Sequence, residues 1–298
     1  MTITTIPEVF VSTGQTPDLL VYNYESNAEV NIKSRITITS HMFSFLLEGE
    51  KEVHFNDLSF RCGNDKGMLF TSGNCLMTER ASSEKHYRSL LFFFSDVRLS
   101  ALRDKYPDLF IKGTAGWALE EAKQVQGEPR GCFVLDQDEF IRHFVASLKH
   151  IAARGPVLTN PMLQLKLEEL MLYLAHTYPT TFPALIASLR TDGSGGRLKR
   201  VVESNIYSNL TLDELAFLCH MSLSTFKRKF ERLYGMSPMR WFHEKRMQQA
   251  AIMLRRQHRK ASEIYGDLGY ENLSSFVQAF KKEFGVTPRV YQGRALAE

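Results

Sequence analysis

The chain has 298 residues, of which 44% are hydrophobic and 23% are charged. This length leaves room for two domains, and the composition is that of a folded globular protein, which argues against general disorder. No run approaches the ~18 apolar residues of a membrane span, and the first residues lack the basic start and apolar centre of a signal peptide, so we expect a cytoplasmic protein.

The charge is unevenly divided along the chain. Residues 197–298 contain 18 Lys and Arg against 10 Asp and Glu, a net charge of +8, whereas the preceding 196 residues carry −4. A basic segment joined to an acidic one indicates that the C-terminal third meets a polyanion and that the rest of the chain does not.

The first stretch, up to about Phe94, is typical of a β-domain. Runs such as HMFSFLLEG and KEVHFN are rich in aromatic and β-branched residues, and turn signals such as Glu48-Gly49 and Gly63-Asn64 separate them at hairpin intervals. Short strands with such closely spaced turns predict a meander that folds into a small barrel or a sandwich. The run LLFFFS is predicted to be a buried strand near its end.

The apolar period changes from two to about 3.6 after Asp96. Helical spacing is found at 136–153 and 161–177, and Asn160 before Pro161 is a helix-start signal for the second of these. One face of this second helix carries Leu163, Leu167, Leu170, Met171 and Leu174. Such a stripe favours packing against the β-domain, with a self-association helix as the alternative.

The stretch RTDGSGGR, residues 190–197, indicates a domain boundary. Glycine loses more conformational entropy on ordering than any other residue, so a glycine-rich stretch favours a flexible linker. We therefore expect three parts: an N-terminal domain at 1–190, a linker at 191–196 and a basic C-terminal domain at 197–298. The predicted fold class is α+β, with a small β-barrel and flanking helices followed by an all-α domain.

The last domain contains an internal repeat. The segment SLSTFKRKFERLYGMSP, which begins at Ser222, recurs fifty positions later as NLSSFVQAFKKEFGVTP. The matched positions are Phe226 with Phe276, Phe230 with Phe280, Gly235 with Gly285 and Pro238 with Pro288. A repeat present in two copies predicts two copies of one small helical unit and not a solenoid.

The first copy has the pattern of a helix-turn-helix. Thr211 and Glu214 form a capping box, a short turn follows at His220, and Ser222 can cap a second helix. The predicted inward stripe of this second helix is Phe226, Phe230 and Leu233, and its outward face is Ser224, Thr225, Lys227, Arg228, Glu231 and Arg232. A helix-turn-helix places such a face in the major groove, where arginine pairs with guanine.

Residues 238–256 connect the two copies and have helical apolar spacing, which predicts a rigid connector. Rigid coupling fixes the distance between the two reading helices. Helices that read one face of B-DNA must sit one turn apart, roughly 34 Å or about 10 base pairs.

Residues 210–256 and 261–291 resemble the two-motif DNA-binding domain of AraC-type (AraC/XylS) transcriptional regulators, through the paired Phe, Gly and Pro positions above and through Ala216, Trp241, Arg246, Gly269 and Tyr270. The resemblance implies base contacts from Ser224, Lys227 and Arg228 in the first motif and from Leu273, Ser274 and Gln278 in the second, with Lys281 and Lys282 on phosphates. Gln278 departs from the arginine that many members carry, and glutamine pairs with adenine.

The N-terminal stretch resembles the cupin-like module of the same family, which commonly senses a signal and self-associates. The resemblance implies double-stranded promoter DNA and RNA polymerase as partners, a small-molecule or protein effector, and a possible homodimer. The residue types on the predicted strands suggest His41, Phe43, Phe45, His54 and Arg80 as lining of an effector pocket, with plain core or surface as the alternative for each.

Two rival functions are weighed against a regulator. A metal-dependent cupin enzyme needs a close H-x-H, but His41, His54 and His86 are dispersed, and the four cysteines form no C-x-x-C pair, so we expect no catalytic site, metal or cofactor. An interaction protein whose basic domain binds acidic surfaces would show no preferred DNA sequence.

Overall fold

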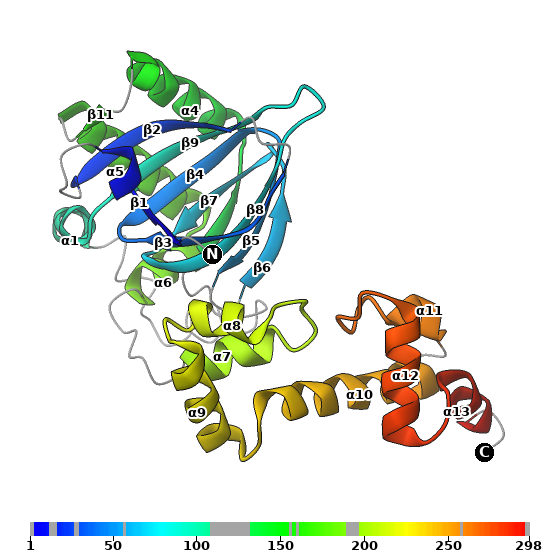
Figure 1. Ribbon diagram of the computed structural model, residues 1–298. Helices are drawn as coiled ribbons and strands as arrows, with labels where there is room; N and C mark the ends of the chain where they lie inside the picture. The colour runs from blue at the N-terminus through cyan, green and yellow to red at the C-terminus, as the bar shows by residue number, and fades with distance from the viewer. Residues whose placement is uncertain are drawn as a thin grey trace. The chain divides into compact units, whose positions relative to one another are not determined.

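The computed structural model describes residues 3–11, 17–26, 30–55, 58–107, 132–154, 157–158, 161–188, 197–256 and 259–295 (Figure 1). The chain divides into two compact units, Met1–Ser194 and Gly195–Glu298. The first unit contains strands and helices and the second contains helices, which confirms the α+β class. The linker expected at 191–196 and the cap expected at Asn160 lie outside the described residues.

The first unit is built on two sheets. One has five strands in the order β1 (Ile3–Ile6), β3 (Val30–Ile38), β8 (Gly73–Arg80), β5 (Glu50–Phe55) and β6 (Leu58–Cys62). The other has six strands in the order β10 (Cys132–Asp136), β7 (Lys66–Phe70), β4 (His41–Glu48), β9 (Tyr87–Phe94), β2 (Leu19–Ser26) and β11 (Val157–Leu158). Of the two expected arrangements, a small barrel or a sandwich, the sheets form the second: among the described strands the edges of the two sheets do not pair with each other, so they do not close into a barrel.

Strand β9 explains how the two sheets are held together. Leu91 and Phe93 pack in a core shared with the five-stranded sheet, whereas Leu90, Phe92 and Phe94 pack in a second core on the opposite face. A strand that is buried on both faces carries a continuous apolar run instead of an alternating one. This double burial is the physical reason for the run LLFFF.

Helices supply the other side of the second core. They are α1 (Asp96–Lys105), α4 (Glu139–Ile151), α5 (Pro161–Thr177) and α6 (Thr181–Ser188), with short 3₁₀ turns η1 (Glu8–Phe10) and η3 (Ala152–Arg154) elsewhere. Figure 1 shows α4 and α5 running behind the six-stranded sheet. None of the described helices is long and apolar enough to cross a membrane.

The helix predicted from Asp136 begins later, at Glu139. Residues 132–136 instead form β10, which pairs antiparallel with β7. The Asp138 carboxylate then accepts a hydrogen bond from the Ile141 backbone N–H at 2.9 Å and so caps α4. Strand pairing, which helical spacing alone does not reveal, keeps residues up to Asp136 out of the helix and delays its start to Glu139.

The leucine stripe of α5 faces inward. Leu163, Leu167 and Leu170 are at most 2% exposed and belong to the core under the six-stranded sheet, while Leu165 on the other face is 63% exposed. The stripe therefore packs the fold, and these leucines offer no surface for self-association.

We predict that Leu167→Ala lowers the free energy of unfolding of the first unit by about 2–5 kcal/mol, because it removes a side chain from a filled core. The matched variant Leu165→Ala should change it by no more than about 0.5 kcal/mol. Urea unfolding followed by circular dichroism measures both. A larger loss for Leu165→Ala would show that the outer face of α5 is covered in solution.

The second unit is all helical. Its elements are α7 (Arg197–Ser204), α8 (Leu212–Leu218), α9 (Leu223–Tyr234), α10 (Pro238–Arg256), α11 (Ala261–Ile264), α12 (Leu273–Phe284) and α13 (Pro288–Ala295). Within this unit α10 runs from the group α7–α9 to the group α11–α13 (Figure 1).

Candidate nucleic-acid interface

Helices α9 and α12 start and stop by the same chemistry. The Ser222 hydroxyl accepts a hydrogen bond from the Thr225 N–H at 3.3 Å, and the side-chain amide oxygen Oδ1 of Asn272 accepts one from the Ser275 N–H at 2.9 Å. Gly235 and Gly285 end the two helices in the left-handed conformation, with φ of 72° and 74°. The fifty-residue repeat in the sequence is therefore a repeat in structure.

Each of the two helices buries an aromatic ladder at every fourth position. In α9, Phe226 and Phe230 are fully buried, and Tyr234 packs on Phe230 with ring centroids 4.5 Å apart. The prediction that Leu233 is the third inward residue is wrong, since its side chain is 51% exposed. Tyr234 takes its place because the Trp241 ring of α10 lies 4.7 Å from it.

The ladder of α12 follows the same rule. Phe276 and Phe280 are fully buried, and Phe284 continues the row at 4.4 Å from Phe280. Tyr291 of α13 packs edge-on against Phe280 at 5.2 Å. Because each ladder anchors one side of its helix, the opposite side faces solvent.

The ten predicted DNA-contacting residues lie on the solvent sides of α9 and α12. Nine of them are exposed: Ser224, Lys227, Arg228, Arg232, Leu273, Ser274, Gln278, Lys281 and Lys282. Thr225 is the exception, being partly buried, and its hydroxyl accepts a hydrogen bond from the Ser222 hydroxyl at 2.9 Å. Thr225 therefore contributes to the helix cap.

The two faces differ in charge. On α9, the adjacent Lys227 and Arg228 are both exposed, and within the described residues neither forms a salt bridge. At the equivalent positions of α12, Val277 packs partly buried against the second motif's core and only Gln278 is exposed. At these two positions the first helix therefore presents two cations, and the second presents one amide.

Arg246 of α10 joins the two helical groups. Its guanidinium donates hydrogen bonds to the backbone carbonyl of Ile206 at 3.1 Å and to that of Ser208 at 2.8 Å, in the turn after α7. Gly269, in the second group, lies against the same turn: a Cβ there would be 2.9 Å from the Tyr207 carbonyl and 3.2 Å from the Arg246 guanidinium carbon. We call these contacts the Arg246 bridge.

The remaining sequence candidates lie in the first unit and do not form one site. Phe43 and Phe45 are fully buried in the core on the helix side of the sheet. His41 contacts Asp96 at 2.8 Å, and burial lowers its pKa. His54 and Arg80 lie 3.8 and 3.9 Å from the Glu52 carboxylate.

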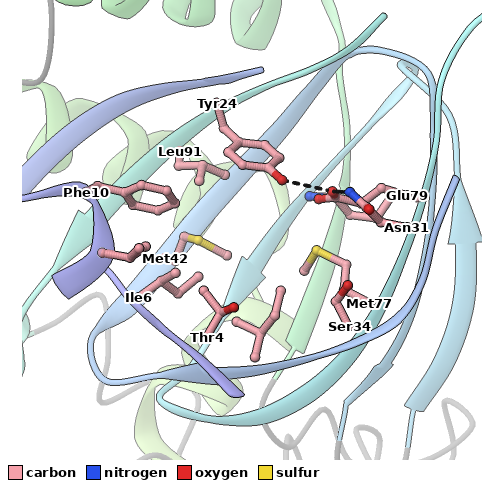
Figure 2. A pocket seen from close by; sticks show the side chains of 13 residues that line it. Thr4, Ile6, Phe10, Tyr24, Asn31, Ser34, Met42, Met77, Glu79 and Leu91 are labelled. Carbon is pink, nitrogen blue, oxygen red and sulfur yellow. Dashed lines mark hydrogen bonds between the residues drawn. The ribbon is translucent and has the colours of Figure 1, made fainter. Parts of the chain in front are cut away.

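A cavity of about 320 Å³ lies elsewhere, between the two sheets, and none of those five residues lines it. Its lining includes Lys51, Tyr24 and Glu79, which sequence reasoning missed. Figure 2 shows Tyr24 and Glu79 at one end of the cavity. A signal was available for Lys51, because it shares one face of β5 with the core residues Val53 and Phe55.

Other chemistry is limited within the described residues. No group of three or more His, Cys, Asp and Glu side chains there is placed to hold a metal ion. The four cysteines are free and buried, and burial raises the pKa of the Cys75 and Cys219 thiols to about 12, which keeps them protonated and unreactive.

Two capped helices that each show a polar face, joined by a long helix, define a double helix-turn-helix domain. Comparison with known proteins agrees: a helix-turn-helix domain family matches residues 215–294, and the ExsA N-terminal regulatory domain family matches residues 41–182. The chain belongs to the AraC-type transcriptional regulators.

Individual relatives are moderately similar. The virulence regulon transcriptional activator VirF of Yersinia enterocolitica is 28% identical over 58% of this chain and 64% of its own length. The regulator ExsA of Pseudomonas aeruginosa is 32% identical over 45% of this chain and 49% of its own length. The matched part of the chain therefore spans less than two thirds of the length of each of these curated relatives. A crystal structure of ToxT from Vibrio cholerae aligns over 92% of this chain and 97% of that one, at 13% identity and a TM-score of 0.37.

We predict that Gly269→Ala weakens binding to DNA with both half-sites more than Gly285→Ala does. Both glycines have a left-handed backbone conformation, with φ of 76° and 74°, so alanine at either position should destabilise the fold by a similar backbone strain of about 1–2 kcal/mol. A Cβ at Gly285 meets nothing within 4 Å, whereas one at Gly269 clashes with the Arg246 bridge.

Gel-shift titration with selected duplexes that carry both half-sites, or the first alone, measures this difference. Affinity for the single half-site should be similar in the two variants. An equal loss on the double site would contradict the role of the Arg246 bridge in setting the spacing of the two helices.

Proposed function

We propose that this protein is a sequence-specific DNA-binding transcriptional regulator that activates transcription at its target promoters. The observation that carries the proposal is the pair of exposed polar helix faces, on α9 and α12, held by one rigid α10. The net charge of +8 on residues 197–298 supports the same partner, because DNA is a polyanion. Its relatives VirF and ExsA carry the names of a transcriptional activator and a transcriptional regulator.

The two helices have different roles in this proposal. Arg228 reads a guanine and Arg232 holds a phosphate, while Lys227, which the resemblance assigns to a base, is a point charge that can also reach a phosphate, so the first helix is the anchor. Gln278 reads an adenine while Lys281 and Lys282 contact the backbone of the second half-site. The nine exposed side chains do not belong to the buried aromatic ladders, which supports the proposal that they can contact DNA.

The N-terminal unit is proposed to control the reading domain through a small molecule or a partner protein, and to hold two copies near one promoter. A second copy on the same DNA raises the effective concentration without new base contacts. Recruitment of RNA polymerase then follows from placement beside the promoter. We propose no enzymatic activity for either unit and no cofactor.

We predict that the full chain selects a common motif from random-sequence duplexes and that Arg228→Ala relaxes the choice at one base pair, at a cost of about 1–3 kcal/mol. Lys281→Ala should instead weaken binding to every sequence alike and reduce the slope of log affinity against log salt by about 1. Selection followed by titration at several salt concentrations measures both variants.

The pair of variants serves as its own control, because one is assigned to a base and the other to a phosphate. If Arg228→Ala lowers affinity equally for all sequences, Arg228 is a phosphate contact. If the full chain selects no motif at all, the regulator proposal fails and a basic surface for acidic proteins replaces it.

A further inference from the structure

The cavity between the two sheets combines an apolar wall with two buried charged side chains. Ile6, Phe10, Met42, Met77 and Leu91 form most of the wall (Figure 2). Phe10 is held in place by stacking on Tyr22, with ring centroids 4.1 Å apart. The volume of about 320 Å³ is at the lower end of the roughly 300–1,000 Å³ of small-molecule sites.

Lys51 is the first charged side chain. It is 1% exposed, and its Nζ donates a hydrogen bond to the Ser44 hydroxyl at 2.8 Å and lies 5.7 Å from the centre of the Tyr87 ring. Within the described residues no carboxylate lies within 4 Å of it. Burial lowers the pKa of this ammonium group. An ammonium has three donors, so the protein leaves hydrogen-bonding capacity unused at a place without bulk water.

Glu79 is the second charged side chain, and it is 7% exposed. Its Oε2 accepts hydrogen bonds from the Tyr24 hydroxyl at 3.1 Å and from the Asn31 amide at 3.4 Å, and the three side chains meet at one end of the cavity (Figure 2). Burial, together with this carboxylate, raises the pKa of the Tyr24 hydroxyl. Tyr24 therefore stays a neutral donor to Glu79.

Burying a lysine without an ion-pair partner destabilises a fold. The Ser44 hydroxyl does not require Lys51, since it also lies 3.1 Å from the Ser89 hydroxyl. An apolar side chain at position 51 would therefore suit the core better than lysine does. A charged group kept at a cost to stability, beside a cavity, indicates a binding role.

We infer that this cavity binds a small uncharged amphiphile whose head offers an oxygen acceptor to Lys51 and an N–H or O–H donor to Glu79, and whose apolar body lies against the wall. Lys51 and Glu79 are not in contact, but their opposite charges act on each other through space and sum to zero, so a charged ligand would add an uncompensated charge to a buried site. A primary carboxamide on an aliphatic chain has this chemistry. The inference rests on the proposed function, in which the N-terminal unit receives the signal.

Octanamide is the probe, and octanoate, which has the same shape and a negative charge, is its matched competitor. Isothermal titration of the full chain should show octanamide binding more tightly than octanoate. Lys51→Met should weaken octanamide binding roughly tenfold or more and raise the temperature of unfolding of the first unit. Glu79→Gln should also weaken it, whereas Lys149→Met, at an exposed position of α4, should not.

Equal or tighter binding of octanoate, unchanged binding by Lys51→Met, or no binding of either probe to the wild-type chain would each overturn the inference. If Lys51→Met does not fold, NMR of the wild-type chain with labelled methionine methyl groups tests the inference instead. Octanamide should shift the signals of Met42 and Met77, which line the cavity, more than that of Met68, which does not. The reverse order would overturn it.

DNA selection with the same protein preparation separates this inference from the proposed function. Sequence-specific DNA binding without octanamide binding would contradict the inferred ligand site and leave the proposed regulator function standing. Octanamide binding without any selected DNA motif would contradict the proposed regulator function and leave the inferred ligand site standing.

Discussion

The placement of one guanidinium sets what the DNA-reading unit can do. Arg246 stands on α10, the element shared by both motifs, and donates to two carbonyls of the turn that precedes α8. Gly269 closes on the same turn from the second motif, where no side chain fits. Because both motifs contact this turn, folding already holds α9 and α12 in one arrangement, and the proposed reading helices need no further ordering when DNA binds.

A different constraint organises the first unit. Strand β9 is buried on both faces, so the six-stranded sheet separates two cores, one against the helices and one against the five-stranded sheet. The helix-side core is mostly apolar, with the buried His41 ring packed against Phe94. The space between the sheets instead holds Lys51 and Glu79 and leaves a cavity. Among the residues that the structure describes, the unit thus combines a packed layer with a layer that tolerates polar groups and contains the 320 Å³ cavity.

Sequence reasoning found the parts that depend on local chemistry. The repeat, the caps at Thr211 and Ser222, and the stop at Gly235 could be predicted because each depends on residues within a few positions of one another. Leu233 was placed inward because helical spacing does not separate it from Tyr234, and the choice was made by Trp241 from another helix. The barrel was expected because alternation along strands does not say whether sheet edges meet. Phe43 and Phe45 were proposed for a pocket because a sheet covered on both faces cannot be recognised from one strand.

The exposed leucine at the start of α12 has a consequence for the DNA itself. Leu273 is 38% exposed, and an apolar side chain in the major groove favours the methyl group of thymine. If Arg228 reads a guanine and Gln278 an adenine, as proposed, the first half-site would favour G·C pairs and the second would favour A·T pairs. Such a site is not a palindrome, so one copy bound to it has a polarity along the duplex. Reversing the site would turn the regulatory unit toward the other flank, and transcription on only one side would respond.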